Sequence, residues 1–123
     1  SYTVGPVTLG GGKMVNDDDT EATIMNISGS IADLGLAAEK YTDTTAAGVD
    51  TDTTTMSATY TIAATTFAVE SMKAESASVV SSDEMTYGIH HTVAPGLVAF
   101  VEMTDDEKTA SEETTAIGLA LKF

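Results

Sequence analysis

The chain has 123 residues, 42% of them apolar and none of them cysteine, which suits one folded domain and excludes disulfides and thiolate metal sites. Its 19 acidic residues face only 5 lysines and no arginine, so the net charge of −14 excludes the binding of nucleic acid, whose phosphates it would repel. No apolar run approaches the roughly 18 residues of a membrane-spanning helix.

Apolar residues recur at every second position along most of the chain, which is the pattern of β-strands. Ser1 to Val4 read as the tail of one strand, and about eight longer strands follow. Strands of about 9 to 11 residues suit a tilted membrane crossing better than a soluble sheet. The expected strands are 6–15, 22–31, 34–42, 53–62, 66–74, 84–93, 97–104 and 114–123.

Three hairpins repeat along this pattern at intervals of 31 residues, with their first strands ending at Ile31, Ile62 and Val93. Stepping back by twos from each of these residues gives an apolar face, and Val4 looks like a fourth, truncated copy. Solenoids and propellers carry recurrent Gly, Asn or Trp-Asp signatures that are missing here, so a hairpin repeat is the simpler interpretation.

The connections alternate between two kinds. Tight turns are expected at 32–33, 63–64 and 94–96, whereas longer polar loops are expected around 16–21, 43–54, 75–84 and 105–113. Most of the acidic residues lie in these loops, so one pole of the molecule is acidic. Short turns at one end and long loops at the other are typical of bacterial outer-membrane barrels. A soluble up-and-down sheet with an acidic rim explains the loops equally well.

The last strand carries a specific pattern. Four apolar positions, ending in an aromatic residue, alternate there with small residues and one lysine; they are Ile117, Leu119, Leu121 and Phe123. This pattern is similar to the carboxy-terminal signal of Gram-negative outer-membrane barrels. Three further segments, YTVGPVTLGGGK, MSATYTIAATTFAVES and TYGIHHTVAPGLVAFVEMTDDE, accompany the terminal TAIGLALKF. With these segments the whole chain resembles the carboxy-terminal portion of Gram-negative porins of the alphaproteobacterial type.

The resemblance implies an all-β fold, a transmembrane antiparallel up-and-down β-barrel of 16 strands of which this chain would be the carboxy-terminal half. It also implies a homotrimer in the bacterial outer membrane, in contact with lipid and lipopolysaccharide, that lets small hydrophilic solutes diffuse without a cofactor or catalysis. The family's constriction loop has no counterpart here, so no constriction residues are carried over. The chain is too short for such a barrel and Ser1 to Val4 read as the tail of a strand, so we expect a fragment or a partially determined sequence. The alternatives are a non-conducting eight-stranded outer-membrane barrel and a secreted acidic β domain with a structural or adhesive role.

Three glutamates are expected to line the interior of such a barrel. Glu39, Glu70 and Glu102 follow the three repeat residues by eight or nine positions, on the face opposite the apolar one. A wall of carboxylates in a water-filled pore favours cations. Lys13 and Lys122 are expected on the same inner face, opposite the acids. On the solvated face of a soluble sheet the same residues would line no pore.

Other chemistry has little support. His90 and His91 are adjacent, so they point to opposite faces of a strand and cannot share one metal ion, and no nucleophile elbow or phosphate-binding glycine loop occurs. The runs Asp17–Asp18–Asp19 and Asp105–Asp106–Glu107 carry oxygen ligands suited to Ca²⁺ or Mg²⁺, without EF-hand spacing. One hypothesis is weak divalent bridging to lipopolysaccharide phosphates; the alternative is plain solvated carboxylates.

Overall fold

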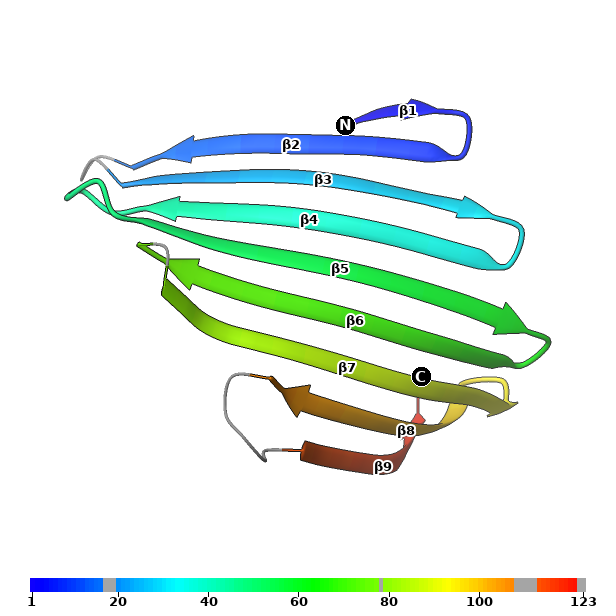
Figure 1. Cartoon of the computed structure of the whole chain (residues 1–123). Coiled ribbons are helices and arrows are strands. Elements are labelled where there is room, and N and C mark those ends of the chain that lie inside the picture. Colours follow the sequence, from blue (N-terminus) through cyan, green and yellow to red (C-terminus); the bar gives the residue numbers. More distant parts are fainter. Residues whose placement is uncertain (17–19, 78, 108–112, 122–123) are drawn as a thin grey trace.

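The computed structural model describes residues 1–16, 20–77, 79–107 and 113–121, and these residues form nine β-strands in one sheet (Figure 1). The strands follow one another across the sheet in chain order, and each pairs with the next in antiparallel fashion. The predicted all-β, up-and-down arrangement is confirmed. The strands are β1 (Tyr2–Val4), β2 (Val7–Val15), β3 (Glu21–Ile31), β4 (Leu34–Thr44), β5 (Asp50–Ile62), β6 (Thr65–Ser76), β7 (Val79–Ala94), β8 (Leu97–Asp106) and β9 (Glu113–Leu121).

Two predicted loops are shorter than expected. The loops expected around 43–54 and 75–84 are mostly strand, since β4 continues to Thr44, β5 begins at Asp50, β6 continues to Ser76 and β7 begins at Val79. The composition of these strand ends suggested loop, but cross-strand hydrogen bonds such as Thr51 Oγ1 to Ser76 Oγ, at 3.2 Å, hold them in the ladder. Tyr2–Val4, expected as the tail of a strand, pairs with β2, so the described chain has nine strands, this short one and eight longer ones.

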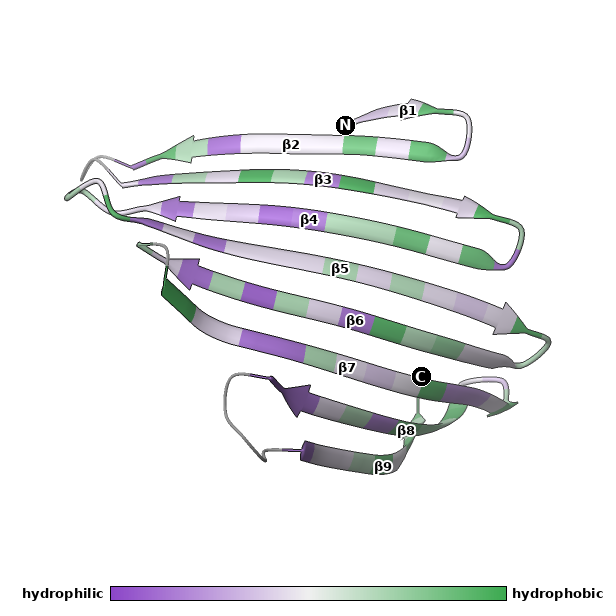
Figure 2. Ribbon diagram, viewed as in Figure 1, coloured by the Kyte–Doolittle hydropathy of each residue, from purple (hydrophilic) through white to green (hydrophobic). Residues whose placement is uncertain are grey.

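The tight turns lie at one end of the sheet and the acidic connections at the other (Figure 1). Figure 2 shows that β4 is hydrophobic near the tight turns and hydrophilic near the opposite end. The described residues include no helix that is long and apolar enough to cross a membrane. The strands are therefore the elements that define both faces of the molecule.

The register divides the side chains into two faces of opposite character, since paired residues project to the same side. One face, here called the apolar face, carries most of the large hydrophobic residues. The other, the polar face, carries small and hydroxyl residues with scattered carboxylates. The apolar face includes Tyr2, Leu9, Met25, Ile27, Ile31, Leu34, Leu36, Met56, Tyr60, Phe67, Val69, Tyr87, Ile89, Val101, Met103, Ile117, Leu119 and Leu121, and the polar face includes Thr8, Asn26, Ser28, Ala37, Glu39, Thr55, Ser57, Glu70, Thr86, His90, Phe100, Glu102, Thr104 and Ala116.

The sheet is a single layer without a core. Among the described residues no hydrophobic side chain is buried, and only Gly88 is buried at all. The apolar face is the more exposed one: on β8, Val101 and Met103 are 41% and 44% exposed, whereas Phe100 on the polar face of the same strand is half-buried. Side chains crowd on the concave side of a curved sheet and splay apart on the convex side, so these exposures indicate that the apolar face is convex.

Water is an unfavourable partner for this apolar face. Covering one large hydrophobic side chain is worth about 1.5–3 kcal/mol, and the face carries many that are more than 40% exposed. Their sum exceeds the net stability of about 5–15 kcal/mol of an ordinary domain. The face therefore needs an apolar medium or another protein surface against it.

The two-residue turns share a backbone conformation that favours glycine. The first residue of each has a positive φ: 58° at Gly5, 52° at Ala32 and 54° at Ala63. An L-residue in this region costs about 1 kcal/mol because its Cβ approaches the neighbouring carbonyl oxygen. The first copy of the repeat thus has a glycine at this turn position, and the next two copies have a strained alanine.

Exchange of Gly and Ala between these turns should change stability in opposite directions. Ala63→Gly should raise the free energy of unfolding by about 0.5–1 kcal/mol, and Gly5→Ala should lower it by a similar amount. A Cβ added at Gly5 would meet no atom within 4 Å, so the change in the free energy of unfolding reports the backbone conformation without a steric clash. Denaturant titration of both variants measures the two effects, and equal signs would contradict the explanation.

Candidate functional site

Three carboxylates share the polar face. Glu39 pairs across the sheet with Asn26 and Thr55. Glu70 pairs with Ser57 and Thr86, and Glu102 with Gly88 and Ala116. The three glutamates therefore form a diagonal row over β4, β6 and β8, with a shift of two residues at each step.

The spacing of this row keeps the repulsion between the three carboxylates small. Two strand spacings across and two residues along separate neighbouring carboxylates by roughly 12 Å. Repulsion at that distance in water is only about 0.3 kcal/mol. In the described chain no lysine lies on this face to compensate the charges, so the row presents a negative surface that needs solvent.

The rest of the polar face is lined by hydroxyl groups. Thr86 and Thr104 hydroxyls lie 3.0 Å apart across β7 and β8, and those of Thr61 and Thr66 lie 3.0 Å apart across β5 and β6. Threonine hydroxyls can form the same hydrogen bonds with water. This face therefore combines small hydrated groups with fixed negative charge.

The expected position of Lys13 on the inner face is wrong. Lys13 pairs with Thr23, on the same face as Leu9 and Ile27. The prediction assumed an extra residue in the turn between Val4 and Val7. Instead, Val4 pairs directly with Val7 across the two-residue turn Gly5-Pro6, so Lys13 lies on the same face as Val4. The extra residue before Glu102 belongs instead to an irregularity between Thr92 and Ala94. Lys122 and Phe123 lie outside the described residues.

All three lysines of the described chain lie on the apolar face near the acidic end, and each forms an ion pair. Nζ–Oε or Nζ–Oδ distances are 2.7 Å for Lys13–Glu21, 2.7 Å for Lys40–Asp52 and 2.9 Å for Lys73–Glu75. We call these three pairs on β2–β6 the ion-pair belt. Two of the pairs, Lys13–Glu21 and Lys40–Asp52, join neighbouring strands and depend on register, whereas Lys73 and Glu75 share a face because they are two residues apart on β6.

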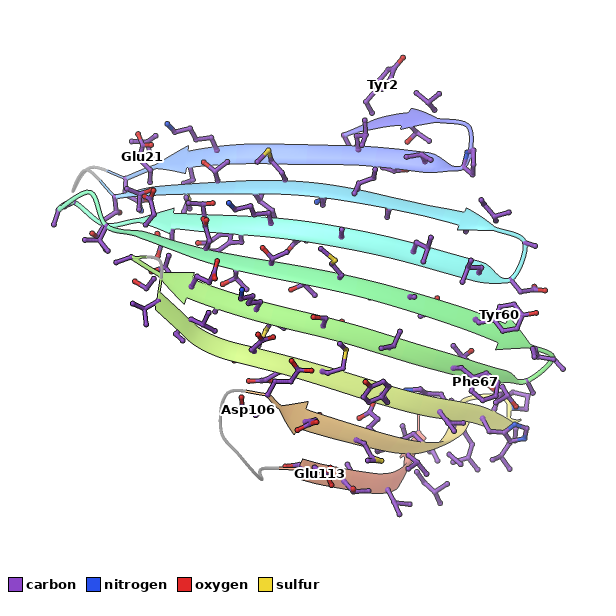
Figure 3. The ribbon with its side chains drawn as sticks, viewed as in Figure 1. Tyr2, Glu21, Tyr60, Phe67, Asp106 and Glu113 are labelled. Carbon is purple, nitrogen blue, oxygen red and sulfur yellow. The ribbon has the colours of Figure 1, made fainter. Side chains whose placement is uncertain are left out.

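The opposite end of the apolar face carries aromatic side chains. Tyr2, Tyr60 and Phe67 lie near the tight turns, while Glu21, Asp106 and Glu113 lie at the other end (Figure 3). Tyr60 and Phe67 are directly paired on β5 and β6. The apolar face thus carries aromatic residues toward the tight turns and the ion-pair belt toward the acidic end.

A second polar-face cluster, absent from the sequence prediction, surrounds His90. Nε2 of His90 lies 3.2 Å from Oε1 of Glu102, and its ring stacks on Phe100 with centroids 6.1 Å apart and planes at 21°. Two glycines leave the space that these rings occupy. A Cβ on Gly88 would lie 2.9 Å from His90 Nε2, and a Cβ on Gly118 would lie 2.7 Å from Phe100 Cζ. The glycines at 88 and 118 in otherwise regular strands were the available sequence signal.

The acidic run that the structure describes does not converge on one point. Asp105 pairs with Met85 and Asp106 with Glu84, so neighbouring carboxylates project to opposite faces. No group of three or more potential metal ligands occurs among the described residues. Asp17, Asp18 and Asp19 lie outside those residues.

The residues of the carboxy-terminal pattern lie on the last strand. Ile117, Leu119 and Leu121 are exposed on the apolar face of β9.

The fold and its surfaces define a class of protein: a single-layer antiparallel meander with one apolar and one hydrated acidic face. No protein-family model matches the chain. No curated protein matches it either. The two faces of the sheet are therefore the features that bear on function.

Proposed function

We propose that this chain forms part of the wall of a porin, a transmembrane β-barrel channel of the bacterial outer membrane for small hydrophilic solutes, with a preference for cations. The observation that carries this proposal is the two-faced sheet without a buried core. Such a sheet is stable where lipid covers one face and water the other, which is the environment of a barrel wall around a pore.

The kinds of residue found at the two ends of the apolar face support lipid as the partner of that face. An apolar face with aromatic residues toward one end and charged residues toward the other matches the hydrocarbon and interface regions of a bilayer. In such a wall the ion-pair belt, with Lys13, Lys40 and Lys73, would lie at the interface, where charged groups remain in contact with water. The carboxylates of the polar face would then lie in the pore.

The open edges of the sheet support a barrel larger than these nine strands. β9 and most of β2 have backbone groups on their outer edges without a strand partner in the described chain, and such groups cost several kcal/mol each in lipid. β1 and β9 run in the same direction because seven alternating strands separate them. Closure by antiparallel pairing therefore requires an odd number of further strands.

The height of the apolar band predicts a preference for thin bilayers. On β3 the band runs from Met25 to Ile31, which is roughly 20 Å along the strand and less after tilting. A porin band is about 25 Å tall. The chemical unfolding midpoint should therefore be higher in bilayers of 12-carbon lipids than of 18-carbon lipids, because the shorter chains reduce mismatch. A midpoint that rises steadily with chain length would contradict this assignment.

Conductance of the native protein that contains this sequence tests the proposed function. The protein should be extracted from membranes with detergent, its intact mass measured, and single channels recorded in planar bilayers. Steady conductance with a reversal potential that favours cations in a salt gradient supports the proposal. A protein that is soluble without detergent indicates the secreted acidic domain, and a membrane protein without conductance indicates the closed small barrel.

A further inference from the structure

Proton uptake at one residue of the polar face would alter the charge of the glutamate row. His90 and His91 are the two histidines of the chain, and the register places His90 on the polar face and His91 on the apolar face. His91 accepts or donates a hydrogen bond with Thr65 Oγ1 at 2.8 Å and contacts no carboxylate in the described chain. His90 is therefore the histidine next to the candidate pore surface.

The surroundings of His90 leave Glu102 as its charged partner. From β8, Phe100 and Glu102 face it; from β6, Thr66 lies opposite and Glu70 lies four residues farther along the strand. On β7 itself, Glu84 shares the polar face six residues away. In the described chain, the cross-strand carboxylate of Glu102 is the one within contact distance, at 3.2 Å.

The ring of His90 is held in this place by packing. It stacks on Phe100, and both rings lie over glycines that leave room for them. Gly88, beneath His90, is buried while its neighbours along β7 are not. A side chain seated in this way keeps its contact with Glu102 in either protonation state, because an Nε2–H can donate to the carboxylate from the neutral or the charged ring.

We infer that His90 and Glu102 are a specificity-determining pair of the proposed channel: the neutral imidazole leaves the Glu102 charge in the pore, and the imidazolium cancels it. This inference rests on the proposed function. Histidine side chains change charge between pH 5 and 8, whereas carboxylates do so at lower pH. The cation preference should therefore be stronger at pH 8 than at pH 5.5.

The test is the cation-to-anion permeability ratio of the native protein, from reversal potentials in KCl gradients near 0.1 M at pH 5.5 and 8. One charge several ångströms from the ion path, screened by salt, should change the ratio by about twofold. His90→Gln should keep the ratio found at pH 8 and remove the change with pH. His91→Gln is the matched control and should retain the full change.

Each outcome has a separate meaning. Cation-selective conductance that does not change between the two pH values, or a change that persists in His90→Gln, overturns the inference and leaves the proposed channel intact. The absence of conductance at both pH values refutes the proposed function instead. The wild-type measurement tests the inference even if His90→Gln does not assemble.

Discussion

Leu36→Lys should lower the free energy of unfolding in lipid bilayers by about 2–4 kcal/mol and reduce the assembled fraction accordingly. Leu36 lies on the apolar face, 52% exposed, between Gly29 and Ala58 in the middle of the band. A lysine introduced there would face hydrocarbon, and its ammonium group could reach water only by snorkelling along the face or by distorting the bilayer, both of which cost free energy. Urea titration of the reconstituted protein gives the loss directly.

Ala37→Lys is the matched control for this change. Ala37 is the next residue along β4 and pairs with Ser28 and Ser57 on the polar face. In the proposed channel this lysine would enter water, so the free energy of unfolding should change by less than about 1 kcal/mol. Equal losses in the two variants would mean that both faces have the same environment, and the membrane assignment would fail. A larger loss at Ala37 would assign the faces in reverse.

The combined variant Glu39→Gln, Glu70→Gln and Glu102→Gln should lower the cation-to-anion permeability ratio by about three- to tenfold at 0.1 M salt. Each carboxylate contributes a few tenths of a kcal/mol to the potential felt by an ion several ångströms away, with opposite sign for cations and anions. Three such contributions multiply in the ratio. Gln keeps the size of the side chain, so the pore dimensions and the single-channel conductance should change far less than the selectivity.

A variant with the same change of charge on the other face separates pore charge from net charge. Glu21, Asp105 and Glu113 lie on the apolar face at the acidic end. Glu21→Gln, Asp105→Asn and Glu113→Gln together should leave the permeability ratio within about twofold of wild type, because these groups lie outside the pore wall. An equal loss of selectivity in both triple variants would show that the glutamate row has no special place in the ion path.

Much of the fold follows from local rules. The period of two predicts strands, and the short segments after Ile31 and Ile62 predict tight turns, because both features depend on residues next to one another in the chain. The ends of the strands were harder to predict. Residues 75–84 are rich in serine, valine and acidic residues, and the pairing of β6 with β7 holds most of them as strand.

The positions of the candidate site residues were likewise predictable where they depend on local sequence and not where they depend on long-range pairing. Sequence alone determined that Glu39 and Glu70 share one face, because each follows a two-residue turn by the same local count. The count for Glu102 needed one extra residue, which the structure places at the irregularity between Thr92 and Ala94. Only the tertiary structure decided the face of Lys13, since that depends on whether an extra residue sits in a turn or in a bulge. The contact of His90 with Glu102 likewise depends on cross-strand register, which long-range pairing sets and local composition does not.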